Sequence, residues 1–156
     1  MTVKELCTSI GADYDAALRT FGTEKMLAKF LLRFPKDPTY SKLKEGYEKG
    51  DAEQIFGAVH DMKSVYGNYG LKRFQEIAVE VTEAYRPWHN AFQEELSGAK
   101  AKGTESEFDA NDCLDRLVPR FAADVAARVD MPAIMEEITG MYENVITKIR
   151  QFEAEQ

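Results

Sequence analysis

The sequence has little cysteine, little histidine and no long apolar run. Its only cysteines, Cys7 and Cys113, are far apart and show none of the paired spacings of disulfide-rich or zinc-binding domains. This usage favours a reducing compartment. We expect the cytoplasm, because the first five residues also lack the apolar stretch of a secretory signal. The apolar residues Phe30, Leu31 and Leu32 are followed at once by Arg33, so no membrane-spanning helix and no membrane partner are expected.

Basic residues are also in the minority. The chain carries 20 Lys and Arg against 27 Asp and Glu, and its formal net charge is -7. Nucleic-acid binding depends on clustered Lys and Arg, so we expect no nucleic-acid partner. Hydrophobic residues make up 44% of the chain and charged residues 30%, which is ordinary for a soluble globular protein. A length of 156 residues allows one domain with a proper core, and we expect a single domain over residues 1–156.

Apolar residues at helical spacing run through nearly the whole chain, and no strand pattern competes with them. A capping box at Thr2–Glu5 predicts a short first helix. Further helices are predicted from Thr23 to Pro35, from Pro38 to Gly50, from Asp51 to Gly70, from Leu71 onward, and from Met131 to Phe152. The pattern predicts an all-α fold, an up-and-down four-helix bundle with a short N-terminal helix.

Residues 87–130 exceed what such a bundle needs. Pro87 is expected to kink the preceding helix, to end it, or to begin a new one. Residues 97–107 are small and polar and predict a surface loop. Asp109 to Val129 again has helical spacing. We therefore expect 87–130 to form a helical insertion or an extended hairpin before the last helix.

The helix predicted to follow Asp51 contains His60. At about 100° per residue, Ile55, Val59, Met62, Tyr66 and Tyr69 share one buried stripe, and His60 lies about 140° from Ile55. His60 should therefore be exposed. The residues expected around it are the small Gly57, Ser64 and Gly67, with Lys63 and a half-exposed Phe56 on the flank towards the core.

This arrangement suits phosphoryl chemistry. A neutral imidazole is a nucleophile that can form an N–P bond, and a lysine one turn later can approach the charge of the phosphoryl group. Glycines inside a helix cost about 1 kcal/mol each relative to alanine, a cost that close approach of a second protein would explain. No Gly-rich phosphate loop or carboxylate cluster accompanies His60, so the chain lacks the parts to bind ATP and Mg²⁺ itself.

The segment His60-Asp61-Met62-Lys63-Ser64, followed by Gly67-Asn68-Tyr69-Gly70, resembles the histidine-phosphotransfer (HPt) family of two-component phosphorelays. His60 matches the family's phosphoacceptor, Lys63 its lysine and Gly70 its downstream glycine. The resemblance implies a phosphocarrier, not an enzyme, that exchanges a phosphoryl group with aspartates of receiver domains. Its partners would be a response-regulator receiver domain, a hybrid sensor kinase, or both. No cofactor is expected, and Mg²⁺ would be held by the partner receiver. The implied docking residues are Phe56, Gly57, Ser64, Gly67 and Gly70.

The sequence departs from the family pattern in three places. Ser64 stands where a glycine usually follows the lysine, and this small side chain should still permit docking. Tyr66 stands where a small residue is common, and its helical position predicts that it points inward. The extra length of 87–130 is the third departure.

Two other hypotheses stay open. One is a non-catalytic HPt-like adaptor that binds a receiver or kinase without carrying phosphate. The other is a structural bundle whose interface is the region 87–129. A di-iron bundle is excluded because the residues three before the two histidines are Gly57 and Arg86, not glutamates. His89 has no supporting motif and is expected to be an ordinary surface residue, and neither histidine has a hydrolase nucleophile motif nearby.

Overall fold

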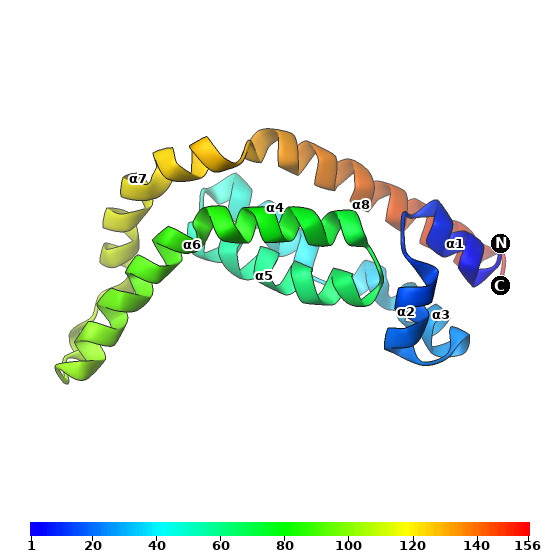
Figure 1. Cartoon of the computed structure of the whole chain (residues 1–156), viewed down its shortest axis with the longest axis horizontal. Coiled ribbons are helices and arrows are strands. Elements are labelled where there is room, and N and C mark those ends of the chain that lie inside the picture. Colours follow the sequence, from blue (N-terminus) through cyan, green and yellow to red (C-terminus); the bar gives the residue numbers. More distant parts are fainter.

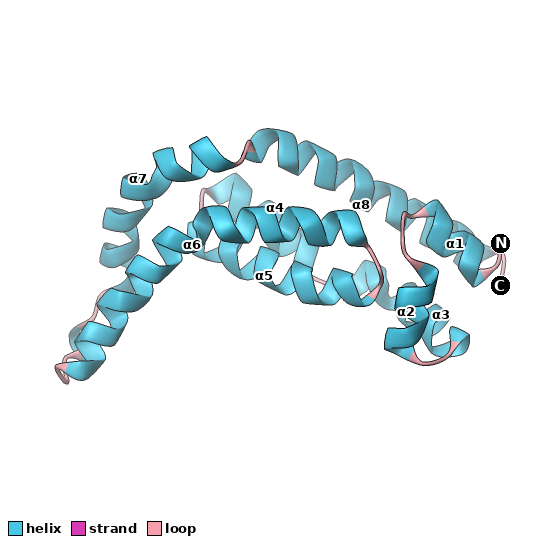
Figure 2. Ribbon diagram, in the orientation of Figure 1, coloured by secondary structure: helices cyan, strands magenta, loops and turns pink.

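The computed structural model describes all 156 residues and confirms the all-α fold. Helices and short links account for the whole chain, without a strand (Figure 2). The helices are α1 (Val3–Ser9), α2 (Tyr14–Phe21), α3 (Glu24–Arg33), α4 (Thr39–Lys49), α5 (Ala52–Asn68), α6 (Lys72–Ala101), α7 (Ala110–Arg128) and α8 (Met131–Ala154), with short 3-10 turns η1 (Phe34–Lys36) and η2 (Glu105–Glu107).

Polar side chains set where most of these helices begin. In each case the side chain of the residue before the helix accepts a hydrogen bond from a backbone N–H of the first turn, which would otherwise have no partner. The predicted capping box at Thr2 and Glu5 is confirmed. Helix α2, which the apolar spacing did not predict, begins after Asp13 in the same way. The other side-chain caps are Thr23, Asp51, Asp109 and Asp130.

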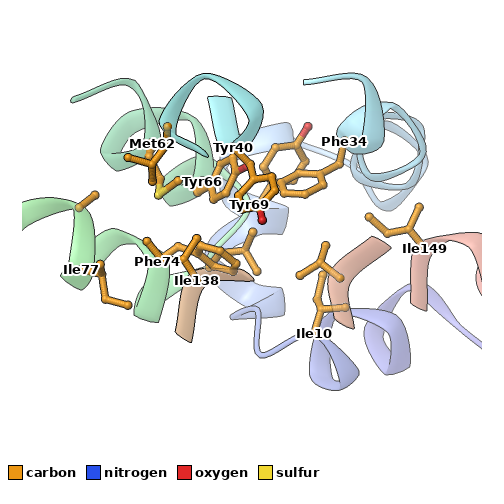
Figure 3. Close-up of a cluster of buried hydrophobic side chains, with 14 of the residues drawn as sticks. Ile10, Phe34, Tyr40, Met62, Tyr66, Tyr69, Phe74, Ile77, Ile138 and Ile149 are labelled. Atoms are coloured by element: carbon orange, nitrogen blue, oxygen red, sulfur yellow. The ribbon is translucent and has the colours of Figure 1, made fainter. Parts of the chain in front are cut away.

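Helices α4, α5, α6 and α8 form the body of the molecule. Figure 1 shows α6 running beside α5, with α8 returning along the same body and α1 to α3 gathered at the end where both termini lie. A core of 27 buried residues joins these elements. Figure 3 shows its aromatic part, in which the rings of Phe34 and Tyr66 lie 4.9 Å apart. Tyr66 is fully buried, as predicted. Tyr40 attaches α4 to α8 by stacking on Tyr142, with 3.9 Å between the ring centroids.

Helices α6 and α7 form a hairpin that extends beyond the body at the end opposite to the termini (Figure 1). Pro87 lies inside α6 and does not end it. The predicted loop over 97–107 is wrong in its first part, because α6 continues to Ala101 before the turn. Leu96 packs against the smaller core between α6 and α7, so the helix is still held by its partner as it enters this stretch.

A second, smaller core lies where this hairpin joins the body. It consists of six buried residues: Ala52, Phe56, Trp88, Phe92, Cys113 and Leu117. Helix α5 therefore contributes to both cores, with Val59 and Met62 in the large one and Phe56 in the small one. No helix combines the length and the apolar character that crossing a membrane requires.

Candidate functional site

His60 lies in the middle of α5 with its side chain exposed to solvent. The neighbours that define the buried side of this helix, Val59 and Met62, have no measurable exposure. The helix begins where the Asp51 carboxylate accepts a hydrogen bond from the backbone N–H of Gln54, at 3.1 Å. The predicted exposure of His60 is confirmed, and its imidazole is accessible from outside the molecule.

Lys63 lies one turn after His60, and its side chain is also exposed. It takes part in no ion pair within the chain, so its ammonium group is available to a charge on His60. Gly57 and Ser64 are exposed on the same helix, and a methyl group added at Gly57 would meet nothing within 4 Å. The structure thus leaves open space around His60 at both of these small residues.

Phe56 differs from expectation. Its side chain is 9% exposed, not half-exposed, and belongs to the small core. The ring stacks on His89 with 4.1 Å between centroids and lies 6.4 Å from the ring of Trp88. The reason is that α6 passes over this flank of α5, which the periodicity of α5 alone does not reveal. Phe56 packs inside the smaller core, next to His60. The prediction that it is half-exposed and offers a contact to a partner is therefore wrong.

Gly67 and Gly70 are less exposed than their predicted place on a docking surface requires. Gly67 is half-buried, and a Cβ there would lie 2.6 Å from the side-chain nitrogen of Gln75. Gly70 is buried with φ of 71°, and the backbone N–H of Asp13 donates to its carbonyl at 2.9 Å. The left-handed conformation predicted for Gly70 is confirmed. Gly70 does not lie on an exposed docking surface, because it is buried against the Asp13 backbone. The N-terminal segment covers it, and a Cβ would come within 2.5 Å of the Asp13 carbonyl.

Helix α6 places His89 near His60, although the sequence analysis expected His89 to be an ordinary surface residue. His89 is half-buried against Phe56, and both histidine rings lie near Phe56, with 4.1 Å between the Phe56 and His89 centroids and 6.5 Å between those of Phe56 and His60. Burial lowers the pKa of His89 below its usual value, and the neighbouring Arg86 and His60 lower it further. The protonated form of His89 is therefore disfavoured in the folded protein. One feature of the sequence could have predicted that His89 lies near α5. The link Tyr69–Leu71 is so short that α5 and α6 must be antiparallel neighbours.

Glu83 on α6 is paired with one cation and lies in the field of two more. Arg86 forms an ion pair with Glu83 at 2.9 Å, and this contact is the main reason why the pKa of Glu83 is lowered. Lys63 and Arg128 lower it further through their charges. Lys63 comes from α5 and Arg128 from the end of α7, so three helices contribute charge here. No group of three His, Cys, Asp or Glu side chains lies close enough together to hold a metal ion.

Comparisons of the chain with protein-family models, with curated proteins and with solved structures gave no match. The structure itself describes the class of protein: an all-α helical bundle that presents a histidine on the outer face of a central helix. The histidine has a lysine one turn away and small residues on either side.

Proposed function

We propose that this protein is a histidine phosphocarrier of the HPt type, which carries a phosphoryl group on His60 between receiver-domain aspartates. The observation that carries the proposal is the pairing of an exposed His60 with an exposed Lys63 that has no partner in the chain. The HPt-like motif in the sequence supports the same conclusion. Gly57 and Ser64 leave room for the partner to approach.

The chemistry needs little from this chain beyond position and charge. An unprotonated ring nitrogen of His60 attacks the phosphorus of an aspartyl phosphate on the partner, an N–P bond forms, and the P–O bond to the aspartate breaks. The aspartate leaves as a carboxylate, and the proton on the second ring nitrogen is free to pass to water. Lys63 provides a countercharge to the phosphoryl group on His60. The metal and the acidic residues that assist the transfer belong to the partner, and the reverse reaction returns the group.

The adaptor hypothesis predicts a different site. A protein that binds a receiver without carrying phosphate would tolerate a buried histidine, or a lysine engaged in an ion pair elsewhere. Here His60 is exposed and Lys63 is unpaired. The site therefore favours the carrier over the adaptor.

The test uses the two histidines as a matched pair. Wild type, His60→Gln and His89→Gln are each incubated with a panel of receiver domains charged with radiolabelled acetyl phosphate. Wild type and His89→Gln should acquire acid-labile, base-stable label, and His60→Gln should acquire none. Equal label on wild type and His60→Gln would refute the proposal. A receiver that binds wild type stably but transfers no label would decide for the adaptor.

A further inference from the structure

Helix α6 lies antiparallel to α5, and two contacts show which part of it is opposite His60. At one end, the ring of His89 stacks on the ring of Phe56, with 4.1 Å between their centroids. Towards the other end, the side-chain nitrogen of Gln75 donates a hydrogen bond to the backbone carbonyl of Lys63, at 3.3 Å. His60 lies between Phe56 and Lys63 on α5, so the residues of α6 opposite to it lie in the middle of the stretch between Gln75 and His89.

Glu83 and Arg86 lie in this part of α6 and form an ion pair with each other. Both oxygens of the Glu83 carboxylate accept hydrogen bonds from the Arg86 guanidinium, at 2.9 to 3.1 Å. The charge of Lys63 also acts on this carboxylate and contributes to its lowered pKa. Arg86 and His60 in turn both lower the pKa of His89 through their charges. The pair of Glu83 and Arg86 therefore lies beside the imidazole and the ammonium group of the candidate site.

This ion pair is exposed and can exchange partners at little cost. The side chain of Glu83 is 59% exposed and that of Arg86 is 45% exposed, so solvent screens their attraction. Pairs three residues apart on the surface of a helix contribute little to stability. A phosphoryl group carries close to two negative charges and three acceptor oxygens, whereas the carboxylate carries one charge. Arg86 would therefore gain a stronger partner if a phosphoryl group formed next to it.

We propose that Glu83 is a placeholder for the phosphoryl group: its carboxylate holds Arg86 while His60 is free, and Arg86 moves to the phosphoryl oxygens once His60 carries the group. This inference rests on the proposed function. Lys63 on α5 and Arg86 on α6 then contact the group from two sides, and the Glu83 carboxylate is released into solvent. Glu83 competes for Arg86 and repels the phosphoryl group, so it weakens the hold of the site on the group that it carries.

The test loads His60 chemically and needs no receiver. Potassium phosphoramidate phosphorylates histidine: an N–P bond to the imidazole forms, the N–P bond of the reagent breaks, and ammonia leaves. The chain has two histidines, so the phosphorus NMR signal that is missing in His60→Gln belongs to His60. Titrating this signal gives the pKa of the last proton on the phosphoryl group, which falls when positive charge gathers around it.

Glu83→Gln is compared with Glu80→Gln, which removes the same charge from the same helix. The charge of Glu80 acts on Arg73, which pairs with Glu137 and so lies on the side of α6 that faces α8. Glu83→Gln should lower the pKa of the phosphoryl group by about half a unit, and Glu80→Gln should leave it unchanged. Arg86→Gln should raise this pKa by about half a unit, because it removes a cation from the group.

The exchange of partners is followed at Arg86 itself. Its Nε–H group gives a nitrogen–proton NMR signal, which is identified by its absence in Arg86→Gln. Phosphorylation of the wild type should move this signal to the position found in phosphorylated Glu83→Gln, because the guanidinium then has the same partner in both proteins. In the unphosphorylated proteins the two signals should differ, since only the wild type has the carboxylate.

Two results would overturn the proposal. An equal phosphoryl pKa in Glu83→Gln and Glu80→Gln would show that Glu83 does not act on the group. An Arg86 signal that stays in place when the wild type is phosphorylated would show that Arg86 remains with Glu83. Failure of every receiver to label His60 would refute the phosphocarrier proposal instead, and the chemically loaded protein would still report on Glu83, so the two proposals fail separately.

Discussion

Arg128, at the end of α7, donates a hydrogen bond from Nη1 to the backbone carbonyl of Glu83 in α6, at 3.3 Å. This carbonyl is the one that the helix cannot satisfy, because the residue four positions later is Pro87, which has no N–H. Figure 1 shows that α6 changes direction partway along its length. The hydrogen bond from Arg128 thus satisfies a carbonyl freed by the proline and attaches the end of α7 to α6.

Replacing Arg128 by alanine should loosen this attachment. We expect Arg128→Ala to lower the free energy of unfolding by about 1 kcal/mol, because the Glu83 carbonyl loses its partner. Hydrogen exchange should accelerate in α7 and in the second half of α6 and remain unchanged in α4. Arg150→Ala is the control, since Arg150 is exposed on α8 and forms no ion pair within the chain. Uniformly faster exchange along the whole chain would contradict the proposed local role.

Two glycines of the motif should respond to alanine with opposite signs. Gly70→Ala should destabilise the protein by about 2 kcal/mol or more, because its φ of 71° is unfavourable for alanine and the Asp13 backbone occupies the space of a Cβ. Gly57→Ala should stabilise it by about 0.5 to 1 kcal/mol, since the site is an open helical position. Urea unfolding followed by circular dichroism measures both. A loss of stability in Gly57→Ala would contradict the structure.

His89 should make stability depend on pH. Burial lowers its pKa in the folded protein below the ordinary value of 6.5, so the unfolded chain binds this proton more readily. The free energy of unfolding should therefore fall as the pH drops below about 6.5. His89→Phe keeps a ring against Phe56 and removes the titration, so it should lose less stability than wild type between about pH 7.5 and about pH 5.5. Identical losses in the two proteins would show that His89 is protonated as readily folded as unfolded.

Lys63 should affect the phosphorylated form more than the free form. If His60 carries the phosphoryl group, Lys63→Ala should slow transfer from a charged receiver about tenfold, because one charge-assisted contact is lost. Lys63→Arg should retain most of the rate. Lys25→Ala, an exposed substitution on α3, should have no effect. Transfer rates that are the same in Lys63→Ala and wild type would remove Lys63 from the proposed mechanism.

The parts of the site that the sequence predicts correctly are those that one helix determines by itself. The exposure of His60 and the burial of Met62 and Tyr66 follow from their angular positions, and the structure agrees. Phe56 could not be placed in this way, because its burial depends on a second helix passing over its flank. The same holds for His89, which a single-helix argument leaves on the surface.

Gly70 shows the other limit of local reasoning. Its left-handed backbone was predictable, since glycine often ends a helix in that conformation. That the N-terminal segment packs on it was not, because this contact joins Asp13 to Gly70 across an intervening span with no complementary pattern in the sequence. Helix α2 was missed for a related reason: it is short, and only the side chain of Asp13 marks its beginning.

The division of the interior into a core of 27 residues and another of six has a consequence for how this protein can vary. The tip of the hairpin lies beyond both cores, so turns added to α6 and α7 together at that tip leave the packing of Phe56 beneath His60 unchanged. The molecule therefore combines a body that fixes the position of the imidazole with an arm whose reach is set by the length of α6 and α7 beyond the smaller core.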